Sequence, residues 1–191
     1  MSDVPPAVAA AREDASTGGL QIFATALGPC GIAWGAGGIV GLQLPEGDVA
    51  ATLQRLRRRF PRLREAAATD EVRTVAATVT DLLDGGNPDF GFVRLAFDGV
   101  PPFHRQVYAI ARAIPRGATR TYGDIARELG DVTLSRAVGQ ALGANPFPPI
   151  VPCHRVLGAS GHGGFSAHGG VDTKLRMLAI EEASGLQFSM F

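Results

Sequence analysis

Short apolar runs alternate with glycine-rich segments near the start of the chain. The apolar or alternating runs are 20–27, 32–34 and 39–44, and the glycine-rich segments between them are 28–31 and 35–38. Because glycine adopts the turn conformations that join neighbouring strands, this pattern predicts an antiparallel meander. It places Cys30 in a hairpin turn, where the residue is too isolated to bind a metal. A later apolar run at 90–97 predicts one more strand.

Two amphipathic segments follow the meander. The first covers 48–60, opened by an aspartate, a residue type that caps helices, and closed by a proline. Its apolar residues recur at helical spacing at Val49, Leu53 and Leu56. The second covers 70–83 and ends before a glycine pair. Arginines gather between 55 and 64; we interpret them as the solvated side of a helix, with contact to DNA as the alternative. Together these elements predict a small α+β domain over 19–100.

Helical spacing dominates the second half, beyond a linker at 98–102. The predicted helices are 103–114, 121–129, 134–142 and 171–183. Thr121, followed three residues later by Asp124, predicts a capping box at the start of the second of these helices. Only a brief turn separates the second helix from the third, so the sequence predicts a helix-turn-helix. A proline-rich strand at 145–156 and a glycine-rich loop at 158–170 come next.

Composition narrows the class of protein. The chain has 191 residues, of which 46% are hydrophobic, and only two cysteines, which indicates a globular protein without a disulfide framework and predicts a cytoplasmic location. Residues 1–18 are rich in alanine, proline and serine, so we expect a flexible segment rather than a secretory signal. No apolar run reaches the roughly 20 residues of a membrane helix, which argues against membrane association.

Charge is distributed unevenly although it sums to zero. Residues 1–103 contain nine basic and twelve acidic residues, whereas 104–191 contain nine basic residues, six acidic residues and all four histidines. This asymmetry points to an anionic partner for the C-terminal part. Every basic residue except Lys174 is an arginine, which suits phosphate and base contacts, although genomic base composition produces the same bias.

The densest group of reactive side chains is Pro152-Cys153-His154-Arg155-Val156. The adjacent histidine and arginine favour a thiolate, and the prolines upstream fix the position of the sulfur; a buried, inert cysteine is the alternative. Adjacent residues of an extended strand point to opposite faces, so Cys153 and His154 need a bend or a bridging water to act together. This arrangement disfavours a papain-type protease, and the lack of a Cys-x-x-Cys motif disfavours redox chemistry.

These residues resemble the O6-alkylguanine-DNA alkyltransferases, also called methylated-DNA–protein-cysteine methyltransferases. The cysteine motif is preceded by Asn145-Pro146 and by a Ser-Arg-Ala-Val-Gly segment at 135–139, and a glycine-aromatic loop follows it. The resemblance implies an α+β fold, in which a small N-terminal α/β domain with a ribonuclease H-like sheet precedes a DNA-binding alkyltransferase domain over 101–191. That second domain is expected to be helical, with a winged helix-turn-helix.

The resemblance also implies the reaction and its residues. A DNA repair protein of this family moves the alkyl group of O6-alkylguanine, with O4-alkylthymine as a possible second substrate, irreversibly to its own cysteine, once per molecule. In this chain the implied roles are nucleophile for Cys153, base through a water for His154, orienting carboxylate for Glu181, hinge for Asn145, and proton donor and aid to nucleotide extrusion for Tyr122. A thiolate and a protonated leaving group are what such a displacement requires.

Further residues are expected to meet the DNA. The resemblance implies that Arg136 fills the stack where the flipped base was, that Thr121, Ser135 and Ala137 also contact DNA, and that Val156, Phe165 and Ser166 line the guanine pocket. It implies alkylated double-stranded DNA as the partner, bound in the minor groove without sequence preference, a monomer, and neither a metal nor a cofactor. Base flipping costs a few kcal/mol, which an inserted arginine partly offsets.

The sequence departs from the family pattern in its glycine-rich loop. The segment 164–170 is about two residues longer than is usual, and Phe165 stands where tyrosine is common. We expect His168 in this loop to face solvent, with phosphate contact as the alternative. Glu182 competes with Glu181 for His154, and helical spacing from Lys174 favours Glu181.

Two other classes of protein remain as alternatives. A non-catalytic protein that recognises alkylation damage shares this domain but lacks the cysteine, so the presence of Cys153 favours chemistry. A helix-turn-helix transcription regulator usually adds a dimerisation or sensor module, and the sequence has no heptad repeat or cysteine-rich module.

Overall fold

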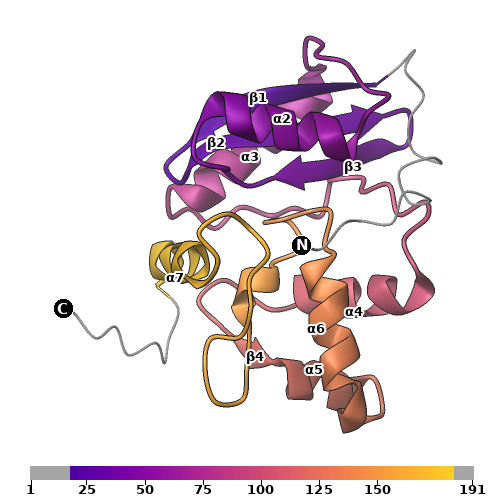
Figure 1. Cartoon of the computed structure of the whole chain (residues 1–191), viewed down its shortest axis with the longest axis vertical. Helices are drawn as coiled ribbons and strands as arrows, with labels where there is room; N and C mark the ends of the chain where they lie inside the picture. The colour runs from indigo at the N-terminus through magenta and orange to yellow at the C-terminus, as the bar shows by residue number, and fades with distance from the viewer. Residues whose placement is uncertain (1–17, 183–191) are drawn as a thin grey trace.

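A computed structural model of the chain describes residues 18–182 (Figure 1). The protein is α+β: a three-stranded antiparallel sheet with helices comes first, and a mainly helical part with a two-stranded parallel sheet follows. Residues 1–17 of the segment that we expected to be flexible, and residue 183 of the last predicted helix, lie outside the described residues. Among the described helices, none is long and apolar enough to cross a membrane.

The predicted antiparallel meander is confirmed. Its strands are β1 (Gly19–Thr25), β2 (Gly28–Gly35) and β3 (Gly38–Gln43), which pair in chain order. The prediction for Cys30 is wrong, because this residue lies inside β2 opposite Phe23 rather than in a turn.

A glycine in β2 accounts for that error. An added Cβ at Gly31 would lie 2.9 Å from Cδ2 of Leu56, so this glycine allows close packing of the helix that carries Leu56. Glycine inside a strand often marks such a close approach, and here it resembles a turn signal in the sequence.

Helices cover both faces of this sheet. Helix α2 (Val49–Arg59) packs on one face through Leu56, and helix α3 (Asp70–Leu83) packs on the other through an apolar stripe (Figure 1). Each helix starts where the sequence predicts: the side chain of Asp48 accepts a hydrogen bond from the backbone of α2, and that of Thr69 caps α3. The alternating residues of β2 and β3 supply both faces, as period-two strands do.

The strand predicted at 90–97 does not form. A turn with a hydrogen bond from the Val93 amide to the Phe90 carbonyl interrupts the run, and only Leu95 makes a β-bridge, parallel to Ile39 of β3. The apolar residues of this run serve the core instead, since Val93 and Ala96 are buried. The run of apolar residues therefore indicated burial without indicating strand pairing.

The second half is built from short helices close to the predicted positions. They are α4 (Pro102–Arg112), α5 (Tyr122–Glu128), α6 (Ser135–Gly143) and α7 (Val171–Ile180). The predicted capping box of α5 is confirmed: the Thr121 hydroxyl accepts from the Asp124 amide at 3.0 Å, and the Asp124 carboxylate accepts from the Thr121 amide at 2.8 Å. A single 3-10 turn, Val132–Leu134, separates α5 from α6.

The strand predicted at 145–156 is also wrong over most of its length. Four prolines remove amide donors from this segment, and it forms turns that end in a 3-10 helix, η2 (Cys153–Arg155). Only β5 (Val156–Leu157) is a strand, and it pairs in parallel with β4 (Arg120–Thr121). The consequence is that Cys153 and His154 sit on a turn rather than on opposite faces of a strand.

The two halves share one hydrophobic core. Buried residues of the sheet, such as Leu42, belong to the same cluster as Val107 of α4, Val138 of α6 and Cys153. A backbone hydrogen bond of 2.8 Å from the Leu42 amide to the Pro146 carbonyl crosses between the halves. The cysteine motif therefore lies next to the surface where the sheet half and the helical half meet.

Candidate functional site

The η2 turn buries three consecutive reactive side chains, those of Cys153, His154 and Arg155. Asn145 holds the approach to this turn: its side-chain amide donates to the Val151 carbonyl at 2.8 Å and to Cys153 Sγ at 3.4 Å. Its side-chain oxygen accepts from the Phe147 amide at 2.9 Å. Asn145 thus fixes the loop before the cysteine and directs an N–H at the sulfur.

The surroundings of Cys153 act on its pKa in opposite directions. Burial raises the pKa of the Cys153 thiol, while the hydrogen bond from Asn145 and the positive charge of Lys174 lower it. An amide donor and a nearby cation both stabilise a thiolate. Arg155, in contrast to the expectation from its place in the sequence, is hydrogen-bonded to Glu181 and to the Ile114 carbonyl rather than to the sulfur.

A buried carboxylate lies behind the cysteine. Glu181 Oε1 is 2.9 Å from His154 Nε2 and 2.8 Å from Arg155 Nη2, and its Oε2 accepts from Arg155 Nε at 2.9 Å. Burial alone raises the pKa of Glu181, but these hydrogen bonds and the neighbouring positive charge hold it at about 2. Glu182 is exposed, so the carboxylate that faces His154 is that of Glu181.

The two ring nitrogens of His154 have different surroundings. Its Nε2 faces Glu181, while Nδ1 is buried without a hydrogen-bond partner among the described residues. Burial lowers the pKa of His154, although the bond to Glu181 opposes this shift. A neutral imidazole bonded to a carboxylate at one nitrogen can accept a proton at the other.

Lys174 of α7 is a site residue that the sequence reasoning used only to mark spacing. Its Nζ donates to the Val156 carbonyl at 2.7 Å and to the Gly164 carbonyl at 3.4 Å, and it lies 5.9 Å from the centre of the Tyr122 ring and 6.0 Å from that of Phe165. Burial lowers the pKa of Lys174 to about 8, against the charge of Cys153. The sequence signal for this role is a charged residue on the apolar face of a helix, because Lys174 is buried on α7 together with Met177 and Leu178.

Tyr122 begins α5 and reaches the same loop. Its hydroxyl donates to the Gly164 carbonyl at 3.4 Å, so Tyr122 and Lys174 share one acceptor. Burial, and then the negative charge of Cys153, raise the pKa of Tyr122. The hydroxyl is therefore protonated at neutral pH and can act as a hydrogen-bond or proton donor.

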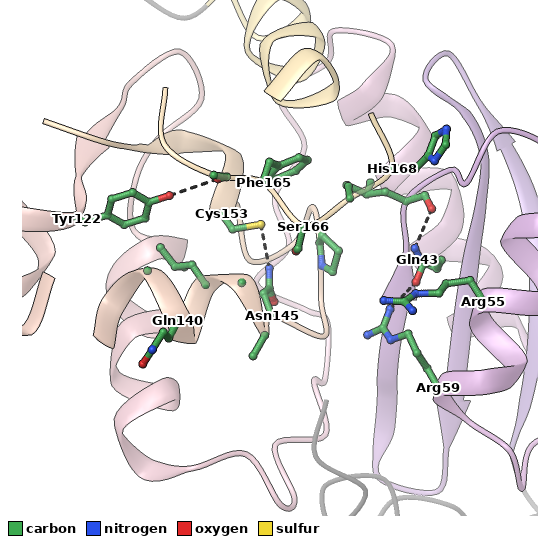
Figure 2. Close-up of a pocket in the computed structure, with 18 of the residues that line it drawn as sticks. Gln43, Arg55, Arg59, Tyr122, Gln140, Asn145, Cys153, Phe165, Ser166 and His168 are labelled. Carbon is green, nitrogen blue, oxygen red and sulfur yellow. Dashed lines mark hydrogen bonds between the residues drawn. The ribbon is translucent and has the colours of Figure 1, made fainter. Parts of the chain in front are cut away.

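A groove of about 980 Å³ opens in front of Cys153 (Figure 2). Of the residues proposed from the sequence, the ones that line this groove are Tyr122, Ser135, Arg136, Asn145, Cys153, Phe165 and Ser166. Thr121, Ala137 and Val156 do not line it: the Thr121 hydroxyl is used in the capping box, and Val156 is buried and offers its carbonyl to Lys174. His168 lines the groove as an exposed residue.

The sheet half supplies residues to this groove that the sequence reasoning missed. Gln43, Arg55 and Arg59 lie on its far side. Arg59 is not simply solvated, as we expected of this arginine cluster, because its Nη1 donates to the Leu42 carbonyl at 2.7 Å and to the Gln43 side chain at 2.8 Å. Long-range contacts of α2 and β3 with Pro146, in the turn before η2, bring these residues to the groove.

Known proteins match both halves of the chain. A family model described as "6-O-methylguanine DNA methyltransferase, DNA binding domain" matches residues 102–183. A relative from Methanothermobacter thermautotrophicus, named methylated-DNA–protein-cysteine methyltransferase, is 31% identical over 154 residues, which are 81% of this chain and 80% of that one. A relative of the same name from Mycolicibacterium paratuberculosis is 49% identical over 80 residues, which are 41% of this chain and 47% of that one.

Solved structures agree with these matches. The O6-methylguanine methyltransferase of Mycobacterium tuberculosis superposes with a TM-score of 0.70 at 28% identity, covering 90% of this chain and 96% of that one. The M. tuberculosis OGT in complex with DNA superposes with a TM-score of 0.68 at 31% identity, covering 85% and 92%. The fold and the buried cysteine turn define an alkyltransferase-like protein. The chain belongs to the methylated-DNA–protein-cysteine methyltransferase family.

Proposed function

We propose that this chain is a DNA repair protein that transfers the alkyl group of O6-alkylguanine in DNA to the sulfur of its own Cys153. Family membership supplies the class of reaction. The observation that carries the assignment to this residue is that Cys153 lines the groove and receives both an amide N–H from Asn145 and the charge of Lys174. A buried sulfur held in this way is suited to nucleophilic attack.

The proposed step balances with groups that the chain provides. The thiol proton of Cys153 moves through a water to Nδ1 of His154, and the resulting imidazolium is stabilised by Glu181, 2.9 Å from Nε2. The thiolate attacks the alkyl carbon, the S–C bond forms, and the bond from that carbon to O6 of guanine breaks. An ordinary thiol, with a pKa of ~8.5, is only a few per cent ionised at neutral pH, so this assistance increases the reactive fraction.

Tyr122 supplies the proton for the leaving group in this proposal. Guanine departs with the electron pair of the broken C–O bond and accepts a proton from the Tyr122 hydroxyl, which lines the same groove. The thioether on Cys153 is stable, so each molecule acts once. No metal or cofactor takes part, and we propose that the same groups remove the alkyl group of O4-alkylthymine.

We propose that α5 and α6 form a winged helix-turn-helix that binds the DNA in its minor groove without sequence preference. Arg136, exposed on α6 and lining the groove, takes the place of the flipped base, while Thr121, Ser135 and Ala137 contact the backbone. The M. tuberculosis OGT that superposes on this chain was solved with DNA, which supports DNA as the partner.

We further propose that the N-terminal half contains a ribonuclease H-like sheet, that the protein is a monomer, and that it is located in the cytoplasm.

Intact mass measured before and after incubation with a short duplex that carries one O6-methylguanine tests the proposal. We expect a gain of one methyl group per chain, on Cys153 by peptide mapping, that does not rise further with excess duplex. In the matched variant Cys153→Ser we expect no gain but retained binding to the duplex. Tight binding without any mass gain in the unaltered protein would instead identify a non-catalytic damage-recognition protein.

A further inference from the structure

The groove in front of Cys153 is larger than one flipped base requires. A pocket for a whole drug-sized ligand is on the order of 300–1,000 Å³, and this groove has about 980 Å³. One end is formed by Cys153, Tyr122 and the loop around Phe165, and the other end by α2 and β3 of the sheet half (Figure 2). The far end is therefore available to a part of the DNA other than the damaged base.

Two arginines of α2 extend toward this far end (Figure 2). Arg59 is already engaged by the protein: besides Leu42 and Gln43, its Nη2 donates to the Pro146 carbonyl at 3.4 Å, so it ties α2 to the turn before η2. Arg55 lies four residues earlier, hence on the same face of the helix. No described residue forms a hydrogen bond or an ion pair with the half-buried Arg55 guanidinium.

The charge around Arg55 favours an anion. Among the described residues that line the groove, three are arginines, Arg55, Arg59 and Arg136, and one carries a carboxylate, Glu46. That carboxylate already accepts a hydrogen bond of 2.9 Å from the Gln43 side chain. Because these arginines outnumber the carboxylate, they create a positive potential in the groove that attracts an anionic ligand.

We infer that Arg55 binds a backbone phosphate of the DNA strand that carries the lesion, so that the sheet half takes part in holding the substrate. This inference rests on the proposed function. Arg136 lies on α6, the helix that is proposed to enter the DNA, and Arg55 lies on α2 of the sheet half; both line the groove that Cys153 also lines. A guanidinium presents planar N–H donors that match a phosphate, and within residues 18–182 nothing occupies these donors of Arg55.

The same helix offers a matched control. Arg58 carries the same charge on α2, is exposed, and does not line the groove. Arg57 is less suitable because it pairs with Glu65. Arg55→Ala and Arg58→Ala therefore remove one positive charge each from the same helix, and only the first removes it from the groove.

Binding of a lesion-bearing duplex is measured at several salt concentrations for both variants in the Cys153→Ser background, which prevents turnover. The logarithm of the affinity falls linearly with the logarithm of the salt concentration, and the loss of one phosphate contact decreases the steepness of this fall by about 0.9. We expect this decrease for Arg55→Ala, so that its deficit in affinity shrinks about threefold between 50 and 200 mM salt. We expect no change of slope for Arg58→Ala. Equal slopes for the unaltered chain and Arg55→Ala, or equal decreases in both variants, would overturn the inference.

Neutral methylphosphonate substitutions then locate the phosphate. Each phosphate of the lesion strand is replaced in turn, and the affinity for the substituted duplex is measured for the protein with Arg55 and for the Arg55→Gln variant. We expect one position at which replacement weakens binding only when Arg55 is present. If every replacement has the same effect on both proteins, Arg55 contacts no phosphate.

A reaction without a DNA backbone separates the inference from the proposed function. Free O6-benzylguanine has no phosphate, so we expect Arg55→Ala with Cys153 intact to react with it at the rate of the unaltered chain. If the unaltered chain transfers no alkyl group, the proposed function fails. If it transfers normally and Arg55→Ala is equally slow with free base and with duplex, Arg55 shapes the pocket and the phosphate contact is wrong.

Discussion

The chain contains two cysteines, one in each half, and both residues are buried. Cys30 in β2 is 1% exposed and Cys153 in η2 is 8% exposed. Burial raises the pKa of both thiols, and that of Cys30 reaches about 11. Burial of the residue therefore does not distinguish a reactive cysteine from an inert one in this protein.

The groups around each sulfur do distinguish them. Within the described part of the chain, the side-chain hydrogen-bond partner of the Cys30 sulfur is the Thr25 hydroxyl at 3.6 Å, and Cys30 otherwise belongs to the hydrophobic cluster that includes residues of α3. Cys153 has the Asn145 amide, the Lys174 charge and an opening to the groove. The two environments therefore differ in whether a neighbouring group stabilises the charged form of the sulfur and in whether a substrate can reach it.

Replacement of the carboxylate behind Cys153 is expected to have the largest effect. The pKa of Glu181 is about 2 in the fold, below its ordinary 4.5, so its charge stabilises the folded state above pH 4.5 and this stabilisation is lost as the pH falls toward 2. A shift of this size corresponds to about 3 kcal/mol. We expect Glu181→Gln to lower the free energy of unfolding by about 3 kcal/mol at neutral pH, measured by urea unfolding.

The pH dependence identifies the cause of that loss. We expect the difference between Glu181→Gln and the unaltered chain to narrow as the pH falls from 4.5 toward 2, because the unaltered carboxylate is then protonated too. Glu182→Gln, one residue away and exposed, is the control and is expected to change the free energy of unfolding by less than about 0.5 kcal/mol. A difference that stays constant with pH would contradict the assignment.

Removal of the cation near Cys153 is expected to act on the rate of alkyl transfer. Lys174, with its pKa of about 8, is charged below that pH and lowers the pKa of Cys153. We expect Lys174→Met to raise the pKa of Cys153, so that less thiolate is present and alkyl transfer at neutral pH is slower, on the order of tenfold. The rate is measured with free O6-benzylguanine from below to above pH 8.

The deficit is expected to shrink above pH 8, where Lys174 of the unaltered chain loses its own proton. Arg176→Met removes an exposed cation from the same helix and is expected to leave the rate unchanged. A deficit of the same size at every pH would mean that Lys174 acts only by holding the Gly164 carbonyl and the Val156 carbonyl, not through its charge.

The local order of helices and turns was accessible from the sequence because caps and spacing are local signals. The capping box at Thr121 and the caps at Asp48 and Thr69 mark helix starts in the structure. Besides the misplacement of Cys30, the errors were two predicted strands that do not form as expected, the apolar run at 90–97 and the proline-rich segment at 145–156. A run of apolar residues reports burial, but strand pairing depends on a partner elsewhere in the chain and, at 145–156, on amides that proline lacks.

The site was accessible to the extent that it lies within one stretch of chain. The cysteine motif and Asn145 could be found together, and the spacing from Lys174 favoured Glu181, the carboxylate that the structure brings to His154. Arg55 and Arg59 could not be found in this way, since they reach the groove through packing between halves about 90 residues apart in sequence. Arg155 was misjudged because adjacency in sequence does not fix direction on a 3-10 turn.

The smallest effect on alkyl transfer is expected at the other sulfur. Cys30→Ser places a hydroxyl in the sheet core, where Thr25 is the side-chain hydrogen-bond partner that the described residues offer, so we expect the free energy of unfolding to fall by about 1–2 kcal/mol. We expect the rate of alkyl transfer to stay unchanged, because Cys30 does not line the groove and its pKa of about 11 keeps the thiol protonated at neutral pH. Urea unfolding and the mass assay measure the two quantities separately. Lost transfer in a variant that unfolds like the unaltered chain would mean that Cys30 takes part in the reaction, and the contrast between the two cysteines would then rest on something other than the groups around them.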